Sequence, residues 1–323
     1  MQRALHDHPL WQQHRLLDLL QSILLLGILA AFLALLGYLV WGPAGILLTI
    51  IGGCLLLAIN PGKHPQWVMR AYRAQPLSEF EYPKIYQICE ILSQRAALER
   101  VPTLYRVPSN KLNAFTIGHP KNAVIGISDG LLCQLSMREI SGVLAHEISH
   151  IAHNDLWIMS LGDMLTRLTQ LAAVSGQILL LVNLPLVLFA GVSLNWWAIL
   201  FLIAAPTLSV LALLALSRAR EYSADESAAW LSTDPLALAQ ALKKIEYANG
   251  SWWPQILLPK RFGLSSSLFR THPETKKRVQ RLEQLSQRID SNERIVLADK
   301  PEYWFRPFVH SFNRPYDFWH DWL

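Results

Sequence analysis

Two long stretches of this sequence contain only uncharged residues. The first lies between Asp18 and Lys63, and the second lies between Arg167 and Arg218. Each is longer than 40 residues, which is enough for two bilayer-spanning helices of about 20 residues with a turn between them. We therefore predict four transmembrane helices in two hairpins, at about 19–41 and 44–59 and at about 171–192 and 196–216.

The two predicted hairpins face different alternatives. A signal peptide has an apolar region of about 7–15 residues, and the first stretch is much longer, so it fits a signal peptide poorly. In the second stretch, Asn183, Pro185 and Pro206 interrupt the apolar pattern. A pair of buried helices in a soluble protein is therefore the alternative for this stretch.

Outside the hairpins, the pattern is that of a globular part with helices and short strands. Apolar residues at helical spacing predict a helix at 82–97, and β-like runs follow at 103–107, 114–117 and 123–127. We predict a mainly α membrane protein with a small β-sheet, divided at 1–62, 63–170, 171–217, 218–298 and 299–323. The last segment is rich in aromatic residues and is suited either to anchoring at the membrane interface or to packing over the globular part.

Charge is sparse, and its distribution predicts an orientation. Only 16% of the residues are charged, compared with about 25% in soluble domains. Lys and Arg are absent from the predicted hairpin turns and concentrate beside the apolar stretches, at Arg3, Arg15, Lys63, Arg70, Arg73, Arg167, Arg218 and Arg220. By the positive-inside rule, both termini and the globular part lie on the cytoplasmic side of the cell's inner membrane. The lipid bilayer is the expected partner, and nucleic acid is not, because no nucleic-acid-binding motif is present.

One predicted helix carries the chemistry of the chain. Ser136 and Glu139 have the spacing of a capping box, and the helix that follows contains His146-Glu-Ile-Ser-His150. Residues four apart share a helix face, so His146 and His150 can bind one Zn²⁺. Glu147 can reach a water held by the metal and take its proton. The alternative is an amphipathic helix that carries two histidines and no metal.

A catalytic zinc also needs a third protein ligand. Glu221 and Asp225 follow the second apolar stretch and share a helix face. We predict Glu221 as the third ligand and Asp225 as the acceptor for the free N–H of a ligand histidine. Glu226 is a weaker candidate for the ligand, and Asp155 is suited to capping or supporting the zinc helix.

These motifs resemble those of HtpX-type membrane zinc metallopeptidases, in the wider family that includes the CAAX-prenyl proteases. The resemblance covers most of residues 80–285 and rests on His146–His150, Glu221-Tyr-Ser-Ala-Asp225, Thr271-His-Pro-Glu-Thr-Lys-Lys-Arg278 and Asn113-Ala-Phe115 with Pro120-Lys-Asn-Ala-Val-Ile-Gly-Ile-Ser. It implies a gluzincin-like α+β catalytic domain joined to membrane helices. It also implies the cleavage of membrane or misfolded proteins in protein quality control.

The resemblance further nominates residues for catalysis and for substrate binding. His272 and Arg278 match a family segment that faces the zinc and helps to hold the tetrahedral intermediate. From the sequence alone, His272 before Pro273 also fits the start of a helix. Asn113, Ala114 and Phe115 match the edge strand on which the family's enzymes lay an extended substrate; the alternative for this run is an ordinary interior strand.

The sequence thus favours a zinc endopeptidase of the cytoplasmic membrane with one Zn²⁺ per chain. A protease specialised for lipid-modified peptides is an alternative, as is a zinc-binding membrane scaffold without activity. The scaffold reading does not account for Glu147, because a purely structural zinc site needs no general base. The sequence makes no prediction about the oligomeric state.

Overall fold

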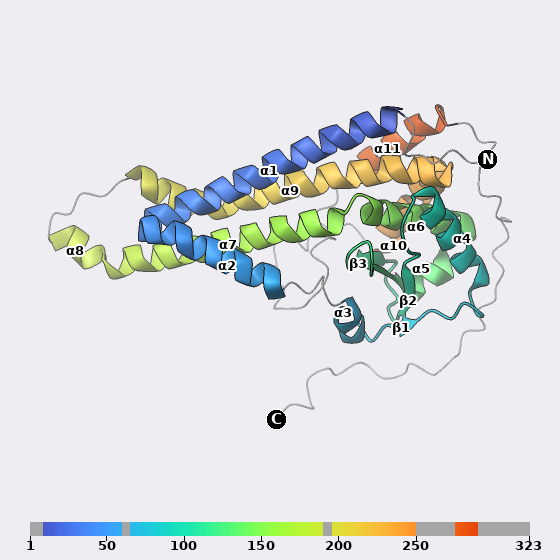
Figure 1. Ribbon diagram of the computed structural model, residues 1–323, viewed down its shortest axis with the longest axis horizontal. Helices are drawn as coiled ribbons and strands as arrows, with labels where there is room; N and C mark the ends of the chain where they lie inside the picture. Colours follow the sequence, from blue (N-terminus) through green and yellow to red (C-terminus); the bar gives the residue numbers. More distant parts are fainter. Residues whose placement is uncertain (1–8, 60–64, 190–195, 250–274, 290–323) are drawn as a thin grey trace, which may run out of the picture.

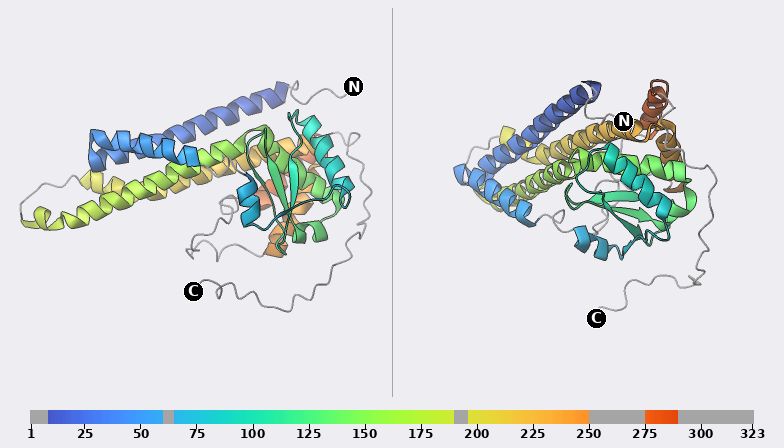
Figure 2. Two further views of the ribbon diagram at one scale, coloured as in Figure 1. Left: turned by 60° about the horizontal axis from the view of Figure 1, so that its bottom comes forward. Right: turned by 45° about the vertical axis from the view of Figure 1, so that its right-hand side comes forward.

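The computed structural model describes residues 9–59, 65–189, 196–249 and 275–289. Figure 1 shows a bundle of long helices at one end and a smaller part with helices and a sheet at the other. The views in Figure 2 show the same division, with the sheet close to one end of the bundle. The predicted mainly helical protein with a small sheet is therefore confirmed.

Within the part of the chain that the structure describes, three of the long helices are apolar enough to cross a membrane. Their candidate spans are Leu19–Trp41 in α1 (Pro9–Trp41), α7 (Asp155–Val182) and α9 (Trp196–Ser232). Helix α2 (Pro43–Ile59) is also apolar, but it has only 17 residues. Four spans in two hairpins thus remain a prediction. Along the three long helices large apolar side chains such as Leu24 and Leu181 are exposed, as expected of a surface that faces lipid.

Helices α1 and α2 approach each other closely beside the turn at Gly42. Gly42 has a φ of 64°, which glycine adopts at little cost. A Cβ on Gly45 would lie 1.9 Å from the carbonyl oxygen of Gly37. The absence of a side chain at this position therefore lets the two backbones touch.

Helices α7 and α9 extend from the bundle into the globular part. Helix α7 begins at Asp155, well before the predicted span at 171–192, and ends at Val182, before α8 (Leu184–Phe189). Helix α9 continues through Pro206 and past the predicted end at 216 as far as Ser232. The predicted divisions at 170/171 and 217/218 consequently fall inside continuous helices.

The globular part is built on a mixed four-stranded sheet in the order β1-β2-β4-β3. Its strands are β1 (Gln75–Pro76), β2 (Thr103–Val107), β3 (Ala114–Ile117) and β4 (Val124–Ser128). Strands β2 and β4 are parallel, and the other two pairings are antiparallel. Strand β3 is therefore an edge strand among the described residues.

The helix with the metal motif, α6 (Met137–Ala152), lies in the centre of the globular core. The predicted capping box is present, because Ser136 Oγ accepts from the Glu139 N–H and Glu139 Oε2 accepts from the Ser136 N–H. A Cβ on Gly142 would lie 2.7 Å from the backbone nitrogen of Leu238, so α6 packs backbone to backbone against its neighbour. The other helices of this part are α3 (Pro65–Ala71), α4 (Pro83–Arg95), α5 (Asp129–Gln134), α10 (Pro235–Asn249) and α11 (Thr275–Ser286).

Candidate active site

The three predicted metal ligands lie together where α6 meets α9. His146 Nε2 is 3.1 Å from His150 Nε2 and 3.5 Å from Glu221 Oε2, and His150 Nε2 is 3.8 Å from Glu221 Oε1. Two nitrogens bound to one tetrahedral zinc at ~2.0–2.1 Å are about 3.3 Å apart. The three donors therefore have nearly the separation that a single small cation requires, and they form one cluster of candidate ligands.

A carboxylate faces the outer nitrogen of each histidine. His150 Nδ1 is 2.9 Å from Asp155 Oδ2, and His146 Nδ1 is 3.1 Å from Asp225 Oδ1. The second contact is an ion-pair contact without the alignment of a hydrogen bond. A carboxylate at Nδ1 favours the proton on that nitrogen, which leaves the Nε2 lone pairs pointing at one another. This arrangement of donors fits a metal cation between them.

Each of these carboxylates is in turn paired with a buried arginine. Arg278 of α11 donates from Nε and Nη2 to Asp225, each over 2.6 Å, and its Nη1 lies 3.0 Å from Glu221 Oε2. Arg220 of α9 donates from Nη1 to Asp155 Oδ1 over 3.0 Å. The site thus has two Arg–Asp–His arrangements, one behind each histidine. Donation from Arg278 to a reaction intermediate remains a prediction.

The electrostatics of the cluster favour positive charge. Burial alone would lower the pKa of His146, but the carboxylates of Asp225 and Glu221 outweigh burial and raise the pKa to about 10. Burial would also lower the pKa of Arg278, and the same two carboxylates raise it above its usual value. Carboxylates that stabilise a proton on a buried imidazole also stabilise a metal cation in its place.

Glu147 follows the first ligand in α6 but lies outside the ligand cluster. Its side chain is 8% exposed, and its Oε2 accepts a hydrogen bond of 2.6 Å from Thr116 Oγ1 in β3. The edge strand and the predicted general base are therefore in direct contact. Glu147 has one carboxylate oxygen held in place by Thr116.

The predicted substrate residues occupy and precede this edge strand. The Asn113 N–H donates to Ser128 Oγ over 2.9 Å, which ties the start of β3 to the end of β4. Phe115 is 6% exposed, and its ring packs against that of Tyr72, with ring centroids 5.1 Å apart. Because Phe115 is buried, its side chain offers little surface to a peptide, and substrate binding along β3 remains a prediction.

One predicted site residue, His272, lies outside the described residues, as do Arg3, Lys63 and the aromatic segment at 299–323. The site also contains residues that the sequence did not assign to it. The sequence suggests Asp155 only as a cap or support, and it does not point to Thr116. Arg220 is predicted only as a membrane-flanking charge, although its place directly before Glu221 in a helix is a signal that it lies near the ligands.

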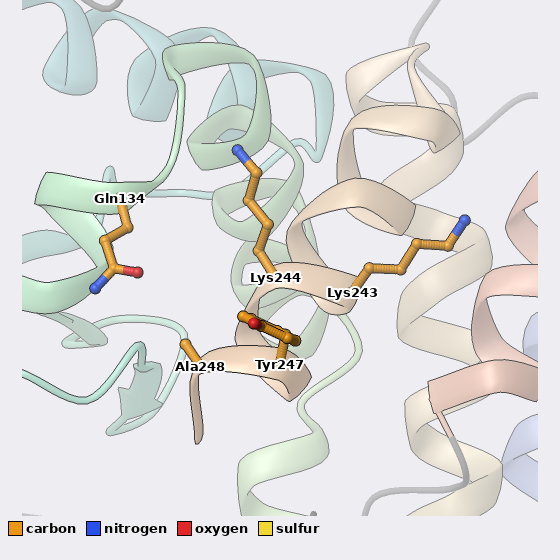
Figure 3. A pocket seen from close by; sticks show the side chains of 5 residues that line it. All are labelled: Gln134, Lys243, Lys244, Tyr247 and Ala248. Atoms are coloured by element: carbon orange, nitrogen blue, oxygen red, sulfur yellow. The ribbon is translucent and has the colours of Figure 1, made fainter. Parts of the chain in front are cut away.

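The pocket in Figure 3 is separate from the ligand cluster. It is lined by Gln134 of α5 and by Lys243, Lys244, Tyr247 and Ala248 of α10. Lys243 Nζ lies 3.0 Å from Glu283 Oε1, and Lys244 Nζ lies 2.7 Å from Glu139 Oε2. Both lysines are engaged in ion pairs between helices, and none of the residues that line this pocket belongs to the ligand cluster.

Comparison with known proteins places the chain among membrane proteases. A protease HtpX homolog of Thermococcus sibiricus is 34% identical over 288 residues, which cover 84% of this chain and 97% of that protein. One from Acaryochloris marina is 33% identical over 306 residues, 86% of this chain and 98% of that protein. Among solved structures, Ste24p of S. mikatae matches with a TM-score of 0.46 and 20% identity over 84% of this chain and 67% of its own.

The family comparison covers both halves of the site. The model of peptidase family M48 matches residues 81–286, a range that includes α6, α9 with its ligand-bearing end and the whole of α11. The same range holds the cluster of two histidines and a glutamate. The family match, the protease relatives and the apolar helices together show that the chain belongs to peptidase family M48 and is a membrane metalloprotease.

Proposed function

We propose that the protein is a zinc-dependent endopeptidase that hydrolyses peptide bonds of membrane or unfolded proteins. His146, His150 and Glu221 hold the Zn²⁺, and Asp225 and Asp155 orient the two imidazoles. The observation that carries the proposal is the convergence of two Nε2 atoms and one carboxylate on a single point, with Glu147 beside them. Two histidines and a glutamate that leave a fourth position open form a known catalytic zinc set.

The residues around the cluster have separable roles. When bound, the metal acidifies a water and polarises the carbonyl of the scissile bond. Glu147 takes the proton of the attacking water and passes it to the leaving amine. Thr116 holds one oxygen of Glu147, which leaves the other for this proton transfer. His272 and Arg278 are the proposed donors to the oxyanion.

Substrate binding is proposed to use the edge of the sheet. An extended peptide that pairs with β3 would lie next to Glu147, because Thr116 joins that strand to the carboxylate. Main-chain pairing binds a chain with little regard for its side chains. Such binding suits a protease of misfolded membrane proteins, and the HtpX names of the relatives agree with a role in quality control.

The proposed location is the inner membrane, with the site on the cytoplasmic side. His146 and His150 precede the uncharged part of α7, and Glu221 follows that of α9, so the proposed ligands lie on the same side of these stretches as Arg167, Arg218 and Arg220. The positive-inside rule assigns such a side to the cytoplasm.

The decisive experiment compares Glu147→Gln with the wild type in detergent, using an unfolded membrane protein as substrate. We expect the wild type to cleave it, and a chelator to stop cleavage. Glu147→Gln should be inactive because an amide cannot accept the proton. Glu226→Gln is the matched control: Glu226 belongs neither to the ligand cluster nor to the proposed proton transfer, so this variant should cleave like the wild type. Equal activity of Glu147→Gln and wild type would refute the mechanism.

A further inference from the structure

The arginine behind His150 also contacts the first membrane helix. Arg220 Nε donates to Ser22 Oγ over 2.9 Å, and Nη2 contacts the same oxygen. Ser22 lies in the candidate span Leu19–Trp41 and is 3% exposed, and Arg220 is 5% exposed. The hydroxyl of Ser22, on an apolar helix, is therefore buried against the guanidinium group of Arg220, which supports the proposed ligand His150 through Asp155.

These contacts form a continuous path across four helices. It runs from Ser22 in α1 to Arg220 in α9, then to Asp155 at the start of α7 and to His150 in α6. The views in Figures 1 and 2 show α1, α7 and α9 side by side along the bundle. The contacts behind His146 are different. There, Asp225 and Arg278 both lie in the globular part.

The guanidinium group makes this path sensitive to the position of α1. It is planar and its N–H directions are fixed relative to one another. When Nε and Nη2 are held at Ser22, the direction in which Nη1 meets Asp155 is fixed as well. Buried charged groups depend strongly on each of their hydrogen bonds, because no water replaces a lost partner.

We propose that Ser22, Arg220 and Asp155 are positioning residues that make metal binding by His150 depend on the seating of α1 in the bundle. The inference rests on the ligand role proposed above for His150. Helix α1 contributes none of the proposed ligands, yet its hydroxyl group sets the orientation of Arg220, and Arg220 sets that of Asp155. Displacement of α1 would then loosen the metal site without any change in the ligands themselves.

The test measures Zn²⁺ affinity of the full chain in detergent by competition with a chromophoric chelator. Ser22→Ala should weaken binding about three- to tenfold, and Asp155→Asn about 10–100-fold. Ser22→Thr keeps a hydroxyl and should restore most of the affinity. Ser209→Ala is the matched control: Ser209 is a buried serine in the membrane part of α9 whose hydroxyl bonds to Pro206 O of its own helix, and affinity should not change.

A double-mutant cycle separates coupling from general loosening of the bundle. Once Asp155→Asn has broken the path, adding Ser22→Ala should weaken Zn²⁺ binding little further. Fully additive effects would overturn the proposal. Should Asp155→Asn fail to fold because Arg220 loses its carboxylate partner, Arg220→Lys takes its place in the cycle, since it keeps the positive charge and removes the fixed set of N–H donors. Bound Co²⁺ provides a second readout, because its visible absorption should change in Ser22→Ala and not in Ser209→Ala.

His150→Ala tests the proposed metal site separately from the proposed coupling to α1. If it binds Zn²⁺ as tightly as the wild type, the proposed metal site is wrong and the coupling falls with it. If it loses Zn²⁺ while Ser22→Ala binds like Ser209→Ala, the metal site stands and the coupling is wrong. Loss of Zn²⁺ in His150→Ala together with weakened binding in Ser22→Ala supports both.

Discussion

Thr116 Oγ1 lies 2.6 Å from Glu147 Oε2, so a hydroxyl on the edge strand of the sheet holds the carboxylate of the proposed general base. Both side chains are buried. The two residues are 31 positions apart in the sequence. Their contact joins the strand that is proposed to align the substrate to the carboxylate that is proposed to activate water. The register of β3 therefore bears on the orientation of the proposed base as well as on that of a peptide proposed to pair with the strand.

Replacing Thr116 should affect turnover more than substrate binding. Thr116→Val keeps the shape of the side chain and removes the donor to Glu147. A hydrogen bond to a charged group contributes about 1.5–3 kcal/mol, so kcat should fall by about 10–100-fold with little change in KM. Thr116→Ser should retain most of the activity. Thr103→Val, at an exposed position of β2, is the control for changes in the sheet; an equal loss there would contradict a specific role for Thr116.

The proposed ligand and the proposed base should respond differently to substitution. Glu221→Ala removes one of three donors and should lower the metal content of the purified protein. Glu147→Gln should retain one metal per chain while losing hydrolysis, because Glu147 lies outside the ligand cluster. Elemental analysis of both variants measures this difference. Metal loss in Glu147→Gln with full retention in Glu221→Ala would reverse the two assignments.

The close packing of α6 against α10 predicts a stability defect away from the ligands. A Cβ on Gly142 would lie 2.7 Å from Leu238 N and 2.9 Å from Leu238 Cα, both of them backbone atoms that cannot rotate away. Gly142→Ala should therefore lower the free energy of unfolding by about 1–3 kcal/mol. Gly27→Ala in α1 has nothing within 4 Å of the new Cβ and should be neutral or slightly stabilising. Thermal unfolding in detergent compares the two, and equal melting temperatures would contradict the packing argument.

Local spacing predicts the parts of the site that lie on one helix. His146 and His150 are one helical turn apart, and the choice of Glu221 follows from the chemistry that two histidines require. The supporting contacts cannot be predicted this way, since Arg220 and Asp155 are 65 residues apart and meet only when α7 and α9 pack.

The lengths of the helices show a second limit of the sequence pattern. Asp163 and Arg167 interrupt the apolar pattern, and the predicted span therefore begins only at 171. In the structure they form an i,i+4 ion pair of 2.8 Å on the exposed side of α7, which continues through them. Hydropathy indicates where a helix becomes apolar, whereas the helix itself begins where its backbone hydrogen bonds begin.

The orientation of the protein can be tested with its own cysteines. Cys133, at the end of the short helix α5 in the globular part, is exposed, and Cys54 is exposed on α2. Cys89 is buried, and burial raises the pKa of its thiol to about 11, so it should not react at neutral pH. A Cys54→Ser variant therefore leaves Cys133 as the reactive thiol of the described residues.

A membrane-impermeant maleimide cannot cross the inner membrane, even in intact cells whose outer membrane has been made permeable. If the site faces the cytoplasm, the Cys54→Ser variant should therefore stay unlabelled in such cells. The same reagent should label it in inverted membrane vesicles, where the cytoplasmic side faces outward. Adding Cys133→Ser should abolish the labelling in vesicles, which shows that the signal comes from this residue. Labelling of Cys133 in the intact cells would place the globular part, and with it the metal cluster, on the opposite side of the membrane. The positive-inside argument from Arg167, Arg218 and Arg220 would then be wrong for this chain.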